Sequence, residues 1–166
     1  MESLRRFPPG EVRGKRVVRA IGFDASVKQY LGPLLYGGCV FIPSTSLTQD
    51  TIGVLRQLKA HDVDILNLTP QLLRIAVDAD LCHFRFVLVS GDTLPPRLVE
   101  DFYARTSPPV QLVNLYGPTE TTINAMAYSV GRNIRYQALP IGRALGSGRV
   151  EVQDASGDHR IGRLGV

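Results

Sequence analysis

The segment DILNLTPQLL at residues 64–73 places a short apolar run directly before a proline. The run at residues 64–68 predicts a buried strand, because a brief apolar stretch bounded by a turn signal is typical of a parallel sheet. Pro70 suits the first turn of a helix, where a backbone N–H has no intrahelical partner. Leu72 and Leu73 then begin an apolar helical stripe. The segment therefore predicts a strand followed at once by a helix.

The same unit recurs along the chain. Further strands are expected at residues 16–21, 38–43, 84–90 and 110–115, and further helices at 25–35, at 48–60 and from Pro95-Pro96 onward. Five strands separated by four helices imply right-handed crossovers, so we predict an α/β fold, a mostly parallel sheet with flanking helices. After residue 120 the pattern changes, with strands expected within residues 122–130 and 149–153 and a turn at 154–158.

Composition limits the class of protein. The chain has 166 residues, of which 44% are hydrophobic and 20% charged, which is typical of one globular domain. No apolar run approaches the roughly 18 to 20 residues of a membrane span, and Met1 is followed by Glu2 and Arg5 rather than by a signal-peptide core. We expect a cytoplasmic protein without a membrane partner.

The net charge of +4 comes mainly from basic residues near the N-terminus. No aromatic interleaving or nucleic-acid motif accompanies them, so we expect a solvated, frayed segment at residues 1–15 and no nucleic-acid partner. Cys39 and Cys82 stand in apolar surroundings and are expected as buried free thiols.

A polar run follows the last predicted parallel strand. The segment NLYGPTETT at residues 114–122 combines an aromatic ring, a Gly-Pro turn, hydroxyls and one carboxylate. Ligands of open α/β sheets bind at the carboxyl ends of strands, and this mixture suits a nucleotide triphosphate and its metal. Taken alone, Tyr-Gly-Pro is an ordinary turn and Glu120 a carboxylate favoured at a helix start.

Five stretches in order carry a resemblance to a known family. They are FDASV at 23–27, NLTP at 67–70, LVSGD at 88–92, NLYGPTETT at 114–122 and PIGR at 140–143. Together they resemble the core motifs of nonribosomal peptide synthetase adenylation domains, which belong to the AMP-forming, adenylate-forming superfamily. The resemblance implies that residues 16–166 are a partial adenylation (AMP-binding) domain, part of the large N-terminal subdomain.

The resemblance implies a two-step ligase that uses ATP. A carboxylate attacks the α-phosphate to give an acyl-adenylate and pyrophosphate, and a phosphopantetheine thiol on a peptidyl carrier domain then takes the acyl group. By their match to the family motif, Glu120 would hold Mg²⁺ through a carboxylate oxygen and Thr119 would donate its hydroxyl to a phosphate oxygen. These two residues are the expected catalytic pair.

The resemblance also implies an adenine site. Tyr116 would pack its ring on the adenine, and Asn114 with the backbone near Leu115 would bond the adenine edge. Gly91 would let the backbone approach the nucleotide closely, since it has no side chain, and Gly117 completes the nucleotide-binding set.

The matching aspartate for the substrate amine is Asp24. In the family it pairs with the α-ammonium of an amino acid, and a desolvated ammonium needs such a counter-charge. A helix N-cap remains the alternative role for this residue.

A side-chain pocket follows from the same position-by-position match. It would be lined by Ala25, Lys28, Asn67, Leu88, Ser90, Leu115, Ile123 and Asn124. Four of these are polar, so the resemblance favours an amino acid with a polar side chain, such as Glu, Asp, Gln or Ser. Asn67 has an alternative role, which is to bond the backbone before Pro70.

Several family elements have no match in the chain. These are the upstream phosphate loop ending in Lys, the downstream ribose-binding Asp, the hinge and the C-terminal Lys. We therefore expect weak or no adenylation by the chain alone. Two other interpretations stay open, an acyl-CoA or aryl-CoA ligase of the same superfamily, against which Asp24 argues, and a truncated, non-catalytic remnant.

Overall fold

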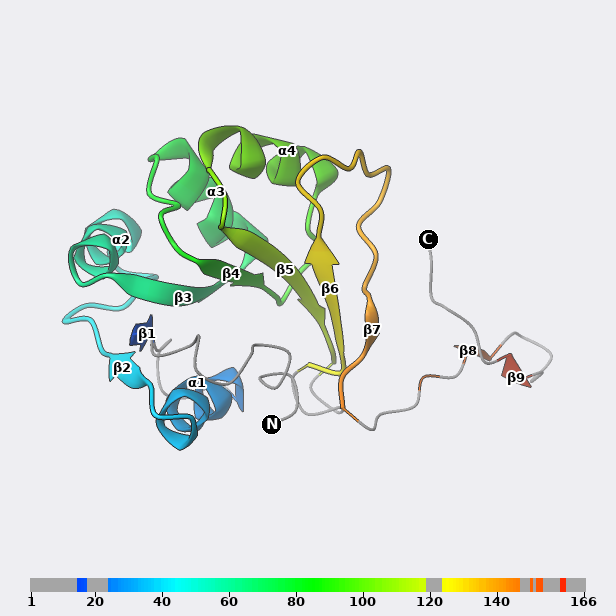
Figure 1. Ribbon diagram of the computed structural model, residues 1–166, viewed down its shortest axis with the longest axis horizontal. Helices are drawn as coiled ribbons and strands as arrows, with labels where there is room; N and C mark the ends of the chain where they lie inside the picture. The colour runs from blue at the N-terminus through cyan, green and yellow to red at the C-terminus, as the bar shows by residue number, and fades with distance from the viewer. Residues whose placement is uncertain are drawn as a thin grey trace.

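Seven strands form one sheet in the order β2-β1-β3-β4-β5-β6-β7 (Figure 1). The computed structural model describes residues 15–17, 24–118, 124–146, 150, 152–153 and 159–160. The strands are β1 (Lys15–Val17), β2 (Cys39–Phe41), β3 (Val63–Leu68), β4 (Phe86–Val89), β5 (Gln111–Tyr116), β6 (Met126–Val130) and β7 (Arg143–Ala144). The helices are α1 (Asp24–Leu35), α2 (Thr51–Ala60), α3 (Pro70–Asp78) and α4 (Pro96–Arg105).

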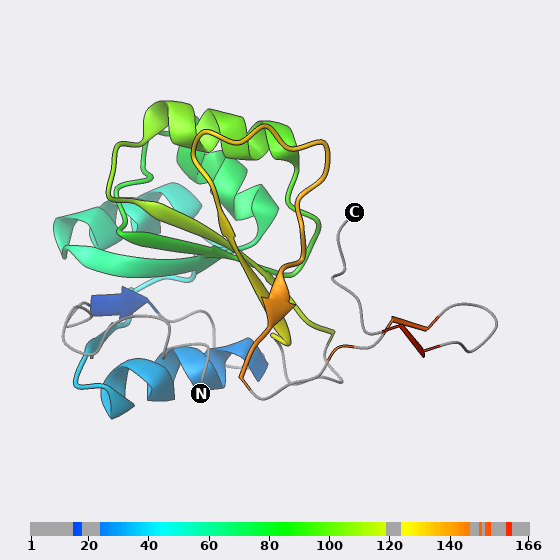
Figure 2. The same cartoon turned by 45° about the vertical axis from the view of Figure 1, so that its right-hand side comes forward.

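The helices cover the two faces of the sheet unequally. α2, α3 and α4 pack on one face and α1 lies on the other (Figure 2). Strands β1 to β5 pair in parallel, whereas β6 and β7 are antiparallel to their neighbours. The predicted α/β class with a mostly parallel sheet and flanking helices is confirmed.

The helix starts follow from local chemistry. Pro70 opens α3, and the Thr69 hydroxyl accepts a hydrogen bond from the Leu72 N–H at 3.3 Å. α2 begins at residue 51 rather than 48 because the Asp50 carboxylate caps it, accepting from the Gly53 N–H at 2.8 Å. Each cap satisfies a backbone donor that the first helical turn leaves unpaired.

The main core lies between the sheet and the layer formed by α2, α3 and α4. Each of the three helices contributes at least one side chain with no exposure, as Leu55, Leu73 and Phe102 show, and Val89 of β4 is equally buried. Full burial of such a side chain contributes about 1.5 to 3 kcal/mol. This core sets the positions of β3, β4 and β5, at whose carboxyl ends the candidate site lies.

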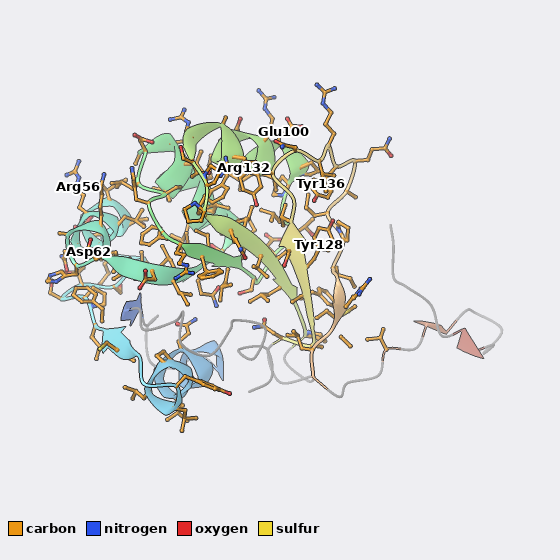
Figure 3. All side chains as sticks on the ribbon, viewed as in Figure 1. Arg56, Asp62, Glu100, Tyr128, Arg132 and Tyr136 are labelled. Carbon is orange, nitrogen blue, oxygen red and sulfur yellow. The ribbon has the colours of Figure 1, made fainter. Side chains whose placement is uncertain are left out.

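A polar clamp joins the end of α4 to the end of β6. The Arg132 guanidinium lies 4.6 Å from the centre of the Tyr103 ring and donates to the carbonyls of Tyr103 at 2.8 Å and Thr106 at 2.6 Å. The Tyr103 hydroxyl donates to the Val130 carbonyl at 2.6 Å. The Tyr136 hydroxyl accepts from the Gly131 N–H at 2.8 Å and lies 3.2 Å from the Tyr128 hydroxyl; Figure 3 labels both tyrosines and Arg132. A cation at a helix C-terminus also complements the helix dipole, so the clamp stabilises this end of the sheet.

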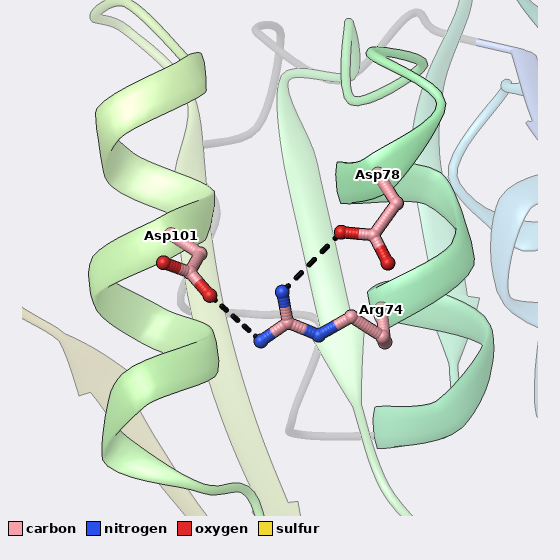
Figure 4. A network of polar contacts seen from close by, with 3 residues as sticks. All are labelled: Arg74, Asp78 and Asp101. Carbon is pink, nitrogen blue, oxygen red and sulfur yellow. Dashed lines mark hydrogen bonds and ion pairs between the residues drawn. The ribbon is translucent and has the colours of Figure 1, made fainter.

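An ion-pair network bridges α3 and α4 on the surface. Arg74 contacts Asp101 at 2.8 Å and Asp78 at 3.4 Å (Figure 4). The hydrogen bond to Asp101 is the main reason why the pKa of Arg74 is raised. All three side chains are more than a third exposed, and exposed pairs contribute at most about 1 kcal/mol. The network is a minor support for the packing of the two helices.

Some predicted segments fall partly outside the described residues. Of the strand expected at 16–21, β1 includes residues 16 and 17, and residues 18–23 lie outside the description. The segment at residues 1–15 lies outside the described residues except for Lys15. The turn expected at residues 154–158 also lies outside them. The short strands β8 (Val152–Gln153) and β9 (His159–Arg160) pair antiparallel on either side of that turn. No helix among the described residues is long and apolar enough to span a membrane.

The two cysteines differ in their exposure. Cys82 is a buried free thiol, as expected, but the expectation for Cys39 was wrong, because this thiol is free and exposed. Cys39 lies on β2, which is one of the two edge strands of the described sheet and has a neighbour on one side only. An apolar sequence context therefore did not bring burial.

Burial makes the stability of the fold depend on pH through Cys82. Burial, with a smaller effect of the Asp80 charge, raises the pKa of this thiol from 9.0 to about 12. In the unfolded chain the Cys82 thiol ionises above pH 9, whereas in the folded chain it stays neutral. The stability that the neutral thiol contributes is therefore complete below pH 9 and is lost as the pH rises towards 12. Urea unfolding should show a loss of about 1 kcal/mol between pH 9 and pH 10.

Two variants separate this thiol from other titrating groups. Cys82→Ala should reduce the slope of unfolding free energy against pH, and Cys39→Ala is the matched control at an exposed thiol. Equal slopes in the parent chain and in Cys82→Ala would contradict the assignment.

Candidate functional site

The end of β5 divides its side chains between the two faces of the sheet. Leu115 belongs to a small apolar cluster with Val113 and Ala127, separate from the main core. Successive strand residues point to opposite faces, so Asn114 and Tyr116 lie on the same face as Leu112, which belongs to the main core with residues of α3 and α4. One short segment thus contributes to two adjoining surfaces.

The surface on the Leu115 side contains a polar pair. Asn67 pairs in register with Leu88 across β3 and β4, and Leu88 packs against the cluster that contains Leu115. The Ser90 hydroxyl donates to Asn67 Oδ1 at 3.2 Å. The structure therefore brings together four predicted pocket residues, Asn67, Leu88, Ser90 and Leu115.

The other predicted pocket residues lie partly or wholly outside the described part of the chain. Asp24, Ala25 and Lys28 lie in the first two turns of α1, and their side chains lie outside the described residues. Figure 2 places α1 on the same side of the sheet as the Asn67 face, opposite α3 and α4. Ile123 also lies outside the described residues, and Asn124, the last predicted pocket residue, is half-buried just before β6. The roles of these residues stay predictions.

On the opposite face, Asn114 makes one directed contact. It is 6% exposed, and its Nδ2 donates to the Pro140 carbonyl at 3.0 Å. A carbonyl oxygen only accepts hydrogen bonds, so the NH₂ end of the amide must face Pro140 and the Oδ1 end must point away. Pro140 was not predicted as the partner of Asn114, although the PIGR motif that contains it was the available signal.

Gly142 holds the loop that carries Pro140. Its φ is +97°, and a side chain there would lie 2.6 Å from the Tyr128 nitrogen and closer still to the Ala127 carbonyl. Only glycine combines this backbone conformation with this close approach. The motif residue therefore acts through the backbone of β6, a role that the sequence did not reveal.

Several of the predicted nucleotide-binding residues are accessible. Gly91 has a φ of +96°, and a Cβ there would meet only the Thr69 methyl group at 3.7 Å. Tyr116 is 48% exposed at the end of β5, and Gly117 beside it is half-buried. The backbone at Gly91 and the ring of Tyr116 are thus accessible for the roles expected of them.

The predicted catalytic pair, Thr119 and Glu120, lies outside the described residues. Within the described part of the chain, no group of three or more His, Cys, Asp or Glu side chains is placed to hold a metal ion. The magnesium role of Glu120 therefore stays a prediction.

Comparison with known proteins identifies the family of the chain. The family model for AMP-binding enzymes matches residues 17–164. The chain is 33% identical over 138 residues to tyrocidine synthase 3 of Brevibacillus parabrevis, covering 81% of this chain and 2% of that protein. It is 35% identical over 158 residues to the AMB antimetabolite synthetase AmbE of Pseudomonas aeruginosa, covering 87% of this chain and 7% of that protein.

Solved structures show the same fold. PA1221, a nonribosomal peptide synthetase protein with adenylation and PCP domains, matches with a TM-score of 0.77 at 31% identity, over 89% of this chain and 26% of its own. The N-terminal subdomain of Klebsiella oxytoca NpsA matches with a TM-score of 0.76 at 25% identity, over 89% of this chain and 39% of its own. The chain thus spans well under half of each, and it belongs to the AMP-binding enzyme family, with the fold of part of an adenylation N-terminal subdomain.

Proposed function

We propose that the chain takes part in ATP-dependent activation of an amino acid for nonribosomal peptide synthesis, as part of a larger adenylation domain. One observation carries the proposal. At the carboxyl ends of β3, β4 and β5, one face of the sheet carries Asn67, Ser90 and Leu115, and the other face carries Asn114 and Tyr116. An amino-acid pocket and a nucleotide site built on the two faces would meet where β5 ends.

The residues present fit a bound adenine nucleotide. Asn114 directs its amide oxygen away from Pro140, which suits an exocyclic amino group, and the exposed Tyr116 ring offers a stacking surface. FmoA3, a nonribosomal peptide synthetase that matches at 25% identity with a TM-score of 0.75, was solved in an AMPPNP-bound form. In this proposal Asn114, Leu115, Tyr116, Gly117 and Gly91 hold the nucleotide.

The amino-acid end is assigned to the face of α1. Asp24 at the start of this helix would pair with the substrate ammonium, and the polar members of the pocket favour a polar side chain. This requirement for an amine favours amino-acid activation over an acyl-CoA or aryl-CoA ligase, whose acids carry no ammonium.

The remaining parts of the reaction rest on residues that the structure does not describe. Glu120 would hold Mg²⁺, which would neutralise phosphate charge, and Thr119 would donate to a phosphate oxygen. A phosphopantetheine thiol on a carrier domain would accept the acyl group. NpsA-ThdA, a fused adenylation-PCP protein, matches this chain at 26% identity with a TM-score of 0.77 and supports such a partner. A cytoplasmic location stays a prediction.

The test is amino-acid-dependent exchange of pyrophosphate into ATP by the complete adenylation domain that includes this chain. Exchange with at least one amino acid is expected, and Glu120→Gln should lower it by about 100-fold because the metal loses a charged ligand. Asp24→Ala should raise the KM for the amino acid at least about 10-fold. Glu100→Gln, on the exposed face of α4, is the matched control and should leave the rate unchanged.

The alternatives predict different outcomes of the same assay. Exchange driven only by carboxylic acids that lack an amine would favour the CoA-ligase interpretation. No exchange with any acid, from a domain that folds, would favour the non-catalytic remnant.

A further inference from the structure

We propose that the substrate's side chain carries a hydrogen-bond acceptor, which binds Nδ2 of Asn67, and that Ser90 is the positioning residue that orients this amide. The inference rests on the proposed function and narrows it, because it names the class of amino acid. It requires an acceptor such as a hydroxyl, an amide carbonyl or a carboxylate, rather than any polar group.

The orientation of Asn67 is set from β4. The Ser90 N–H donates to the Leu68 carbonyl at 3.0 Å, which extends the pairing of β3 and β4 by one residue and holds the Ser90 backbone. From that position the Ser90 hydroxyl donates to Asn67 Oδ1 at 3.2 Å. The acceptor end of the amide is therefore occupied within the protein, and the donor end is left for another partner.

That donor end has no partner within the described chain. Asn67 is 6% exposed, and its Nδ2 is buried without a hydrogen bond among the described residues. Buried polar groups are almost always paired, so a buried donor without a partner in a binding site needs an explanation. A substrate acceptor would supply the missing hydrogen bond, whereas a hydrocarbon or an ammonium group would leave Nδ2 unpaired.

The surroundings of the pair add to this selectivity. Leu88 lies beside Asn67 in the sheet and packs on the apolar cluster of Val113, Leu115 and Ala127. A hydrogen bond beside such an apolar wall is stronger than one in water, and leaving it unmade is more costly. The wall suits an aliphatic stem, and Asn67 suits an acceptor near the end of that stem.

Substrate pairs of similar shape test the inference. Pyrophosphate exchange by the complete adenylation domain should be compared between Thr and Val, between Asn or Asp and Leu, and between Gln or Glu and Met. In the pair that contains the best substrate, the acceptor side chain should have a kcat/KM at least about 10-fold higher. Highest activity with Val, Leu or Met would overturn the inference while leaving amino-acid activation intact. No exchange with any amino acid would overturn the proposed function, and this inference with it.

Variants of the pair test the roles of its two members. Asn67→Asp keeps the shape and the bond from Ser90 but exchanges the outward donor for an oxygen, so kcat/KM for the acceptor substrate should fall at least about 10-fold. Ser90→Ala should lower the ratio of kcat/KM between the acceptor substrate and its apolar counterpart by about 3- to 10-fold, chiefly through KM. Ser90→Thr, which retains the hydroxyl, should restore this ratio. Ser129→Ala, on an exposed position of β6, is the matched control.

If Asn67 and Ser90 served only the fold, their substitution would lower thermal stability without changing the preference in kcat/KM between Thr and Val or within the other substrate pairs. The matched-pair ratio, measured beside the circular-dichroism melting temperature of each variant, separates these outcomes. An unchanged ratio in folded Asn67→Asp and Ser90→Ala would overturn the proposal.

Discussion

Gly142→Ala should destabilise the chain by about 3 to 5 kcal/mol. Two costs add at this position. The φ of +97° disfavours any residue with a side chain, and the new Cβ would lie 2.6 Å from the Tyr128 nitrogen and inside contact distance of the Ala127 carbonyl. Those atoms belong to the backbone of β6, which cannot move aside without breaking its pairing with β5 and β7. Because the chain has no Trp, urea unfolding should be followed by circular dichroism.

Gly37→Ala is the matched control for this prediction. Gly37 also has a positive φ, of +72°, but a Cβ there would meet nothing within 4 Å. Its substitution should therefore cost only the conformational part, about 1 to 2 kcal/mol. Equal losses for the two variants would show that the close approach at Gly142 contributes nothing.

Asn114→Ala should abolish the preference for ATP over ITP. The Pro140 carbonyl binds the NH₂ end of the amide, so Oδ1 is the end that can face a base. An acceptor suits the amino group of adenine, whereas ITP carries an oxygen at that position. We therefore expect the complete domain to prefer ATP by at least about 10-fold in kcat/KM, and the variant to bring this ratio close to one.

The nucleotide ratio distinguishes base recognition from loss of structure. Asn114→Ala also leaves the Pro140 carbonyl without its donor, so its stability should fall by about 1 to 3 kcal/mol. Instability lowers the rates with both nucleotides together, and only a lost base contact changes their ratio. Asn133→Ala, at an exposed position of the loop that contains Pro140, should change neither the stability nor the ATP to ITP ratio. An ATP to ITP ratio that is unaltered in Asn114→Ala would refute the adenine role.

The order and type of the main elements could be predicted because their signals are local. Pro70 and Pro96 mark helix starts that the structure confirms, and the apolar runs at residues 64–68 and 84–90 became β3 and β4. The start of α2 was predicted three residues too early, because the Asp50 side chain decides it through the hydrogen bond that it accepts from Gly53. Periodicity and proline chemistry depend only on near neighbours in the chain, so they can be recognised in the sequence without knowledge of the fold.

Burial could not be predicted in the same way. Cys39 and Cys82 both stand in apolar sequence, yet one is exposed and the other buried. The difference arises because β2 is an edge strand of the sheet, and strand order is a property of the whole chain.

By itself, the sequence determined the α/β class, the order of the βα units and the family, since these depend on local patterns and collinear motifs. Only the tertiary structure decided what the candidate site residues can do. The contact from Asn114 to Pro140 joins residues 26 positions apart, and that from Ser90 to Asn67 joins residues 23 apart. The physical reason is that an amide presents a donor at one end and an acceptor at the other, and which end is free depends on partners that only the folded chain brings near.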